Sequence, residues 1–391
     1  MMKHILKNSI IPMAVVLILV SCKTGTTSGK KNELCVGAYL TEEQAARKLQ
    51  EYAKLYGDAG EWKMRAEKIK ENIYTGGDLD KISEKEWKYP VMVIRGRKHV
   101  LDGYTVENIA LEPKPGYFIT GNLYKPDTIT GKIPAVLCPH GHWFKPGDYG
   151  RFRPDMQKRC AALAKMGAVV YAWDMYGTGE DIQHIHKDPG ALTWQCYNGI
   201  RILDYISALD YVDTNRIAIT GASGGGTQTF LIAALDDRID VSVPVVMVSA
   251  YFFGGCVCES GKPIHKHGAF ETDNVEIAAS IAPKPLMLVG DGDDWTKNLP
   301  LVEFPYIQNI YKLFGAEDNV EYAFFPDEVH DYGFPKRKAV YPFLAKHLDL
   351  DLEKILDKNN KIDESFVTIL DTTQLKVFPG RPLVVNPMQA K

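Results

Sequence analysis

The chain has 391 residues, a formal net charge of -3 and 45% hydrophobic residues. This length suits one large α/β domain with an appended segment, and the composition is typical of a folded enzyme. Charges of both signs are mixed along the chain without a long block of either sign, so the sequence gives no reason to expect nucleic-acid binding.

The first residues have the pattern of an export signal. Lys3 and Lys7 precede an apolar run, residues 10–20, that is too short for an ordinary membrane helix. The run ends in Leu-Val-Ser-Cys, which resembles the lipobox of bacterial lipoproteins, so residues 1–22 are predicted to be a signal peptide with lipid on Cys22. We therefore expect an exported lipoprotein, periplasmic or anchored to the outer membrane by lipid alone, with residues 23–33 as a flexible tether.

Residues 34–88 are predicted to form a helical segment that caps the main domain. Residues 41–72 have a helical period with an apolar stripe, which a break at residues 57–60 interrupts. Residues 89–124 then change to short β-type runs punctuated by Pro and Gly, as in antiparallel strands at a sheet edge.

After Lys132, short apolar runs alternate with helical stretches. This alternation predicts an α/β fold, with a mostly parallel central sheet and helices on both of its faces. The catalytic domain is expected to span residues 89–350, and the weakly patterned residues 351–391 to form a peripheral strand or arm. The predicted strands are residues 135–138, 168–173, 216–220, 242–248, 286–289 and 321–325, and the predicted helices are residues 155–165, 193–209, 228–235, 300–313 and 336–348.

The strongest chemical signal is the sequence Gly-Ala-Ser-Gly-Gly at residues 221–225, between a predicted strand and a predicted helix. In a nucleophile elbow of the form G-x-S-x-G, the sharp turn leaves no room for a side chain at either flanking glycine and holds the serine in a strained geometry. A phosphate-binding turn is disfavoured because no Walker lysine follows and the glycines do not fit a dinucleotide fingerprint. Ser223 is therefore the predicted nucleophile.

An oxyanion hole needs two backbone N–H groups near the nucleophile. Gly224, the residue after the serine, is expected to supply the first. The strand at residues 135–138 runs into Pro-His-Gly-His-Trp at residues 139–143, and either His142 or Trp143 is expected to supply the second. His140 is interpreted as a brace for this loop.

The acid and the histidine of a catalytic triad should follow the serine in that order. The turn after the strand at residues 286–289 offers Asp293 and Asp294, of which only one can serve; Asp294 is preferred because Trp295 and Thr296 can shield it from water. His330 stands after the last predicted strand and before the last helix, where the general base is expected.

These motifs carry a resemblance. Roughly from residue 62 to residue 348, the chain resembles bacterial α/β-hydrolases of the acetyl xylan esterase and dienelactone-hydrolase-related group, which occur as lipoproteins beside polysaccharide-uptake systems. The resemblance implies the α/β-hydrolase fold, a serine nucleophile and hydrolysis of a carbohydrate ester, without a cofactor. The matching stretches are residues 139–142, 174–179, 221–226, 294–296 and 330–333.

Two alternatives to this esterase stay open. A serine peptidase of the prolyl-oligopeptidase kind has the same elbow and triad order, although no propeller repeat precedes the catalytic domain here. A carbohydrate-binding lipoprotein with a decayed site is disfavoured by the intact order of serine, aspartate and histidine. The expected partner is a small-molecule or oligosaccharide ester, while the ester, the sugar and the oligomeric state are not determined by the sequence.

The cysteines give one further signal. Six of them follow Cys22, an even number that permits disulfides without fixing a pairing, and Cys138 and Cys160 are expected to be buried free thiols. The loop with Cys256, Cys258 and Glu259, followed by His265 and His267, contains zinc-ligand types, but the spacing matches no standard zinc motif. We therefore predict no metal and interpret the loop as a lid or a substrate-facing segment.

Overall fold

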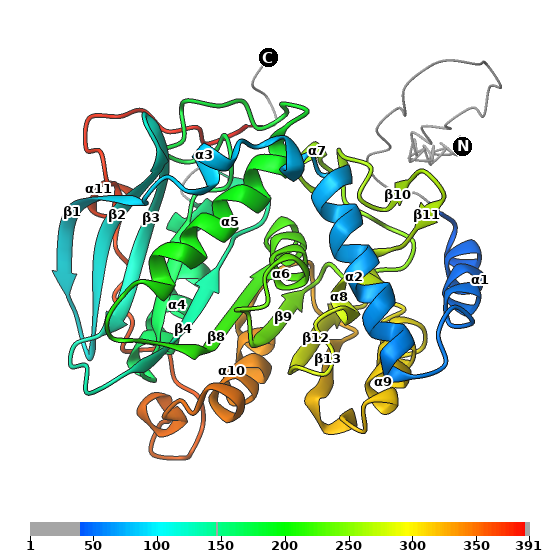
Figure 1. Ribbon diagram of the computed structural model, residues 1–391. Helices are drawn as coiled ribbons and strands as arrows, with labels where there is room; N and C mark the ends of the chain where they lie inside the picture. Colours follow the sequence, from blue (N-terminus) through cyan, green and yellow to red (C-terminus); the bar gives the residue numbers. More distant parts are fainter. Residues whose placement is uncertain (1–39, 146–147, 388–391) are drawn as a thin grey trace, which may run out of the picture. The chain divides into compact units, whose positions relative to one another are not determined.

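A nine-stranded sheet organises the protein, in the order β1-β2-β3-β7-β4-β8-β9-β12-β13 (Figure 1). The computed structural model describes residues 40–145 and 148–387, which belong to one compact unit, Leu34–Lys391. Neighbouring strands run antiparallel from β1 to β7 and parallel from β7 to β13. The strands are β1 (Met92–Val100), β2 (Tyr104–Lys114), β3 (Tyr117–Pro126), β4 (Ile133–Cys138), β7 (Val169–Trp173), β8 (Val212–Ala222), β9 (Val241–Val245), β12 (Leu286–Asp291) and β13 (Val320–Phe325).

The parallel strands are buried on both faces, and each face packs against its own hydrophobic core. Side chains of a strand point alternately to opposite faces. Ile217 and Ile219 of β8 accordingly belong to one core, and Ala218 between them belongs to the other. In the same way Leu288 of β12 faces the first core and Val289 the second. Continuous apolar runs such as these are typical of a parallel sheet covered on both faces.

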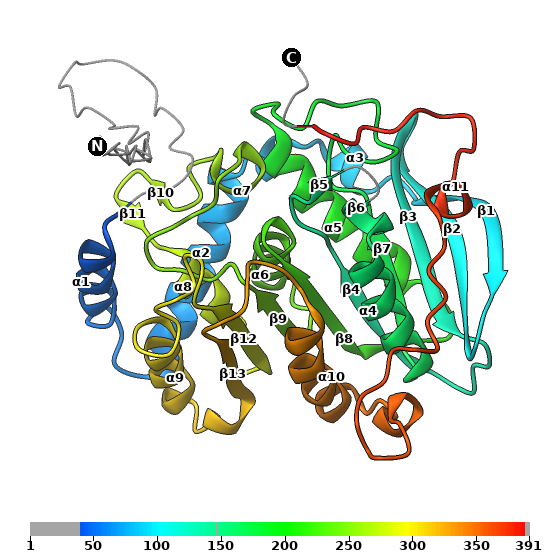
Figure 2. The ribbon, with the colours of Figure 1, turned by 180° about the vertical axis from the view of Figure 1, so that it is seen from behind.

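Helices cover both faces, which confirms the predicted α/β-hydrolase architecture. Figure 1 shows α2 and α5 in front of the sheet, and Figure 2 shows α4 and α10 in front of the opposite face. The first face carries α2 (Ala59–Gly76), α5 (Ala191–Ser207), α6 (Gly224–Leu235), α8 (Asn274–Ala279) and α9 (Glu303–Leu313), and the second carries α4 (Pro154–Lys165) and α10 (Phe334–Leu348).

The helical segment before the sheet is also present. Helix α1 (Glu42–Tyr52) begins with a capping box, in which the Thr41 hydroxyl accepts from the Gln44 N–H at 3.1 Å. The Asp58 carboxylate caps the start of α2 by accepting from the Gly60 and Glu61 N–H groups. Two helices are therefore present as expected, but the break between them is at residues 53–58, a few residues before the expected 57–60. The remaining short α-helices and strands are α3 (Glu84–Trp87), β5 (Phe144–Lys145), β6 (Asp148–Tyr149), α7 (Val257–Ser260), β10 (Lys266–His267), β11 (Phe270–Glu271) and α11 (Thr372–Leu375).

Two parts of the chain differ from what the sequence predicts. Strand β9 ends at Val245, before the expected residue 248, because Val246 has a φ of 45° and leaves the extended conformation. The segment after residue 350 is not simply peripheral, since Leu375 is fully buried and its carbonyl accepts from the side chains of Asn122 and Arg151. This segment therefore completes the packing around β3.

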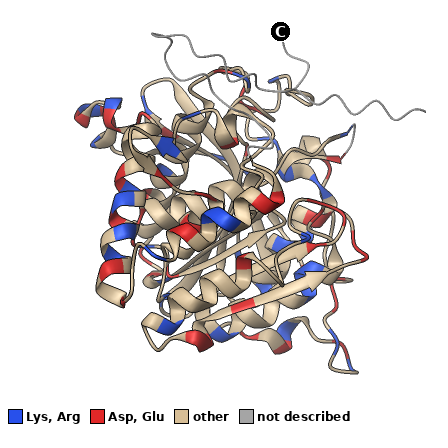
Figure 3. Ribbon diagram, turned by 90° about the vertical axis from the view of Figure 1, so that its right-hand side faces the viewer, with Lys and Arg blue, Asp and Glu red and all other residues tan. Residues whose placement is uncertain are grey.

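The surface has mixed charge. Figure 3 shows Lys and Arg beside Asp and Glu along the helices of the side in view. Within the described residues, no helix is both long enough and apolar enough to span a bilayer. The predicted signal peptide, Cys22 and the tether at residues 23–33 lie outside the described residues.

Candidate active site

Ser223 stands at the sharp turn between β8 and α6. Its backbone has φ 57° and ψ -127°, a left-handed conformation that is unusual for a residue with a side chain. A Cβ atom added at Gly221 would lie 2.6 Å from the Pro139 carbonyl oxygen, and one added at Gly225 would meet the same oxygen at 2.6 Å. Both flanking positions must therefore be glycine, as the elbow motif requires.

A histidine and an aspartate pair at the same edge of the sheet. The Nδ1 atom of His330, after β13, lies 2.5 Å from Oδ2 of Asp294, after β12. The second oxygen of Asp294 accepts from the Thr296 N–H at 2.6 Å and from its hydroxyl at 2.5 Å. The Asp294 side chain is only 3% exposed, whereas Asp293 is exposed to solvent. The structure thus brings Asp294, and not Asp293, to His330.

Two tryptophans flank the imidazole of His330. The ring centroid of Trp295 lies 4.6 Å from that of His330, and Trp143 stacks on the imidazole at 6.1 Å. Phe252 stacks on Trp295 at 4.2 Å and so extends this aromatic wall. The Nε2 atom of His330 is buried and has no hydrogen-bond partner in the described part of the chain. It therefore makes no hydrogen bond to Ser223 in this structure. Hydrogen bonds of catalytic groups often tighten only when substrate binds.

A buried lysine supports the segment that carries His330. Lys336 is fully buried; its ammonium donates to the Val329 carbonyl and lies 3.0 Å from Oδ1 of Asp331 and 3.1 Å from Oδ2 of Asp291. Burial and the nearby charge of Asp294 raise the pKa of Asp291 to about 6, and the Lys336 charge opposes this shift. Sequence reasoning missed Lys336, because a lysine in the first turn of a helix ordinarily lies at the surface.

The loop after β4 passes beside Ser223. His140 is 3% exposed, its Nε2 atom accepts from the Met175 N–H at 3.1 Å, and burial lowers its pKa to about 3. His140 is therefore neutral and braces the loop. The Trp143 N–H donates to the Gly141 carbonyl at 3.1 Å, so it is already engaged. The N–H groups of His142 and Gly224 make no hydrogen bond to any described residue.

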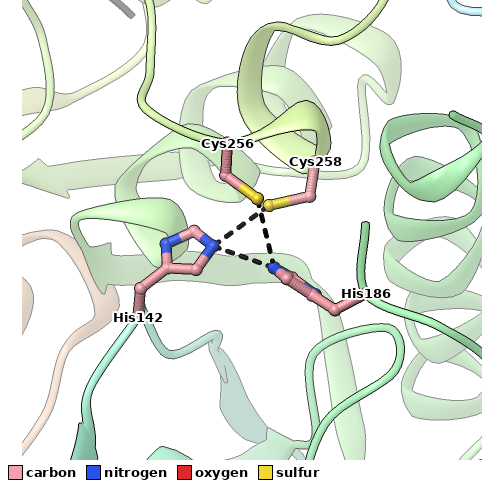
Figure 4. Close-up of side chains that lie close together, drawn as sticks. All are labelled: His142, His186, Cys256 and Cys258. Carbon is pink, nitrogen blue, oxygen red and sulfur yellow. Dashed lines mark hydrogen bonds between the residues drawn. The ribbon is translucent and has the colours of Figure 1, made fainter. Parts of the chain in front are cut away.

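Four side chains form a second cluster beside this loop, shown in Figure 4. The side-chain nitrogen or sulfur atoms of His142, His186, Cys256 and Cys258 all lie within 4.8 Å of one another. The histidines of the sequence motif at residues 265–267 are elsewhere: His265 Nε2 is 2.7 Å from Asn274 Oδ1, and His267 is exposed. The two cysteines are therefore joined by His142 and His186, which come from distant loops, and not by the histidines nearest to them in the sequence.

The described cysteines are all free thiols: Cys138, Cys160, Cys196, Cys256 and Cys258. Cys138 and Cys160 are completely buried, as expected from their apolar contexts.

Comparison with known proteins assigns the chain to a family. Residues 154–350 match the prolyl oligopeptidase family. The chain belongs to this family. YtaP of Bacillus subtilis strain 168, which is named as a hydrolase, is 30% identical over 266 residues, or 60% of this chain and 83% of YtaP.

Solved structures of other proteins share the fold of this prolyl oligopeptidase family member. Methylesterase BT1017 superposes with a TM-score of 0.81 and 39% identity over 88% of this chain and 75% of its own. A glucuronoyl esterase from Teredinibacter turnerae has a TM-score of 0.57 and 14% identity over 81% of this chain and 96% of its own, which shows the shared fold alone. The protein is a serine hydrolase with the α/β-hydrolase fold.

Proposed function

We propose that this family member hydrolyses carbohydrate esters through an acyl-enzyme, with Ser223 as nucleophile, His330 as general base and Asp294 as the orienting acid. The observation that carries the proposal is the His330–Asp294 pair. The buried Nε2 atom of His330 has no hydrogen-bond partner within the described residues, and it lies on the side of the sheet where the parallel strands end and where Ser223 follows β8. The hydrogen bond to Asp294 places the proton of a neutral imidazole on Nδ1. The Nε2 lone pair is then free to accept the serine proton.

The reaction follows from these positions. The Ser223 oxygen attacks the ester carbonyl while His330 Nε2 takes its proton, and the N–H groups of Gly224 and His142 stabilise the resulting oxyanion. The imidazolium returns the proton to the alkoxide, which leaves as an alcohol. Water then attacks the acyl-serine with His330 again as base, which releases the acid and restores the Ser223 hydroxyl. Trp143 is left out of the oxyanion hole because its N–H already donates to Gly141.

The ester class is proposed from the 39% identical relative, which is named a methylesterase. For a methyl ester of a uronic acid, the sugar carries the carbonyl and becomes the acyl group on Ser223, while methanol leaves. For an acetylated sugar, the acetyl group is held by the serine and the sugar leaves. The 18% identical acetyl xylan esterase from Bacteroides fragilis shows the fold alone, so the methyl ester is the first choice.

A peptide substrate is the second candidate, because attack on an amide uses the same groups. The described residues form one nine-stranded sheet and two small two-stranded sheets. They therefore contain no propeller that would restrict the active site to peptides. A panel of acetylated, feruloylated and uronate methyl-ester oligosaccharides, with prolyl peptides added, separates these cases. We expect methanol release from the methyl esters to be fastest, and faster release of an amine from the peptides would contradict the proposal.

Ser223→Ala is the matched control for every substrate in the panel. It removes the atom that forms the covalent intermediate, so turnover of p-nitrophenyl acetate should be lost while the thermal melt stays unchanged. A fluorophosphonate probe should label the wild-type protein at Ser223, and labelling at another serine would contradict the assignment.

We also infer that the protein is exported and attached to a membrane through lipid on Cys22. The lipobox-like residues 19–22 and the polar tether after them support this inference. Cys22→Ser should leave an unlipidated precursor that separates differently in fractionated cells. Equal membrane partition of the variant and the wild type would contradict it.

A further inference from the structure

The cluster in Figure 4 joins three segments that are distant in sequence. His142 follows β4, His186 lies in the loop between β7 and α5, and Cys256 and Cys258 stand at the start of α7. His186 is 0% exposed, Cys256 5% and Cys258 1%. Buried polar atoms normally find a partner, so four converging ligand-type atoms in this interior need an explanation.

The oxygen atoms that face Nδ1 of each imidazole leave the two Nε2 lone pairs directed at each other. His186 Nδ1 is 2.6 Å from the Tyr176 carbonyl, which can only accept, so Nδ1 carries the proton and Nε2 of the neutral ring carries the lone pair. His142 Nδ1 faces Glu259 Oε1 at 3.4 Å, which favours the same tautomer. Yet the two Nε2 atoms are 3.0 Å apart. Two lone pairs at this distance repel unless a proton or a metal ion lies between them.

The two thiols complete the coordination set. Cys258 Sγ is 3.2 Å from His142 Nε2, and Cys256 Sγ is 3.4 Å from His186 Nε2. With zinc–nitrogen and zinc–sulfur bonds of about 2.0 and 2.3 Å, the edges of a tetrahedral N₂S₂ site span about 3.3 to 3.8 Å. The separation of 3.4 Å lies within this range, and those of 3.0 and 3.2 Å lie just below it, so small side-chain movements would admit the ion.

We propose that His142, His186, Cys256 and Cys258 bind one zinc ion. Binding releases the two thiol protons, and Zn²⁺ with two thiolates and two neutral imidazoles has no net charge, which lowers the cost of burying the site. Two thiolates and two imidazoles in a tetrahedron are the ligand set of zinc. Four protein ligands leave no open position, so the ion is structural.

The residues around the cluster are those that usually orient metal ligands. Histidine ligands typically donate their second N–H to a carboxylate or a backbone carbonyl. Glu259 faces His142 in this way and also accepts from the Cys256 N–H at 3.0 Å through its other oxygen. The Tyr176 carbonyl does the same for His186. One carboxylate therefore ties both halves of the site together.

The zinc would also fix the loop beside the nucleophile. A Cβ atom added at Gly224 would lie 2.7 Å from His142 Cε1, so the imidazole packs directly against the residue that follows Ser223. A coordinated His142 therefore cannot shift its backbone N–H away from the position where the oxyanion forms. This consequence for the rate rests on the proposed function, whereas the metal content does not.

Metal analysis of the purified, full-length protein tests the site directly. We expect about one zinc per chain in the wild type and in Cys196→Ser, which alters a buried thiol outside the cluster. The Cys256→Ser/Cys258→Ser variant should contain none. Ser223→Ala should keep its zinc, so failure of the catalytic proposal would leave this result unchanged. Full zinc occupancy in the double variant would overturn the inference.

Measurements on the wild type do not depend on how the variants fold. A strong chelator should lower the melting temperature, and one equivalent of zinc should restore it. Cobalt in place of zinc should give the visible absorption of a tetrahedral thiolate complex, which Cys256→Ser/Cys258→Ser should lack. A wild-type protein that stays free of metal after incubation with zinc, or that contains a Cys256–Cys258 disulfide by mass spectrometry, would overturn the inference.

Discussion

His330 Nδ1 and Asp294 Oδ2 lie 2.5 Å apart, and the carboxylate of the preceding residue, Asp293, points into solvent. Two adjacent acids in one turn therefore have different environments. Thr296 gives Asp294 two further hydrogen bonds, which hold the carboxylate fixed against the imidazole.

We expect Asp294→Asn to lose most of the activity, by orders of magnitude, because an amide no longer stabilises the imidazolium or selects the correct tautomer. Asp293→Asn should keep at least about a tenth, since a solvent-exposed charge acts only through a screened field. The measurement is kcat/KM on a small ester at neutral pH, with a thermal melt of each variant. If Asp293→Asn is the inactive variant, Asp293 is the acid of the triad. If both variants stay active, the acid lies elsewhere in the chain.

The buried Lys336–Asp291 pair supports a second prediction. Lys336→Met should destabilise the protein by about 3 to 5 kcal/mol, because it leaves the Asp291 carboxylate buried without a compensating charge. It should also lower kcat/KM, since Lys336 donates to Val329, the residue before His330. Lys336 is thus a positioning residue.

Adding Asp291→Asn to Lys336→Met separates the two effects. The double variant should regain at least half of the lost free energy of unfolding, because the Asp291 carboxylate is no longer buried without a counter-charge. The hydrogen bond to Val329 stays absent, so kcat/KM should stay low. Urea unfolding and steady-state kinetics measure the two quantities. A double variant that is no more stable than Lys336→Met would show that the ion pair is not the cause.

Arg151 and its partner Glu180 link residues 375–378 to the rest of the fold. Arg151 is fully buried, its Nε lies 3.1 Å from Asp174 Oδ1, and it donates to Glu180, which in turn accepts from the N–H groups of Val377 and Phe378 at 2.8 Å each. Arg151→Met should cost at least about 3 kcal/mol, because two carboxylates lose their buried counter-charge. Urea unfolding measures the loss, with the partly exposed Arg153→Met as the control, and equal stability of the two variants would contradict this role.

The features that sequence reasoning predicted depend on neighbours in the chain. The elbow at Ser223 is visible because glycines flank the serine and a β-type run precedes them, and the parallel strands are visible as apolar runs that alternate with helical ones. Asp294 was preferred to Asp293 for a local reason as well, the shielding by Trp295 and Thr296.

The features that it missed depend on long-range packing. His142 and His186 are 44 residues apart, and Cys256 is a further 70 beyond His186, so no local spacing reveals their convergence. Lys336 and Arg151 were not noticed because charged residues are ordinarily exposed. Both are buried here, where the fold supplies carboxylates from other segments.

A buried acid at the start of α9 makes stability depend on pH. Glu303 is 0% exposed, its Oε1 accepts from the Ala250 N–H at 3.1 Å, and its Oε2 has no partner within the described residues. Burial raises the pKa of Glu303 from 4.5 to about 7, and the backbone hydrogen bonds only partly oppose the shift. At slightly acid pH the Glu303 carboxyl is therefore neutral, which agrees with an Oε2 atom that has no partner to stabilise a negative charge.

The sign of the effect follows from the pKa values. Between pH 4.5 and about 7 the folded protein keeps the Glu303 proton that the unfolded chain has lost, so this group stabilises the fold fully below pH 4.5 and progressively less up to about pH 7. The whole change is on the order of 3 kcal/mol. Glu303→Gln keeps the acceptor for Ala250 and cannot ionise, so its free energy of unfolding relative to the wild type should rise from pH 4.5 to 7 and then level off. Urea unfolding of both proteins across this range tests the prediction, with Glu317→Gln at an exposed position as the control. A difference that is independent of pH would mean that Glu303 titrates in the folded protein as it does in the unfolded chain.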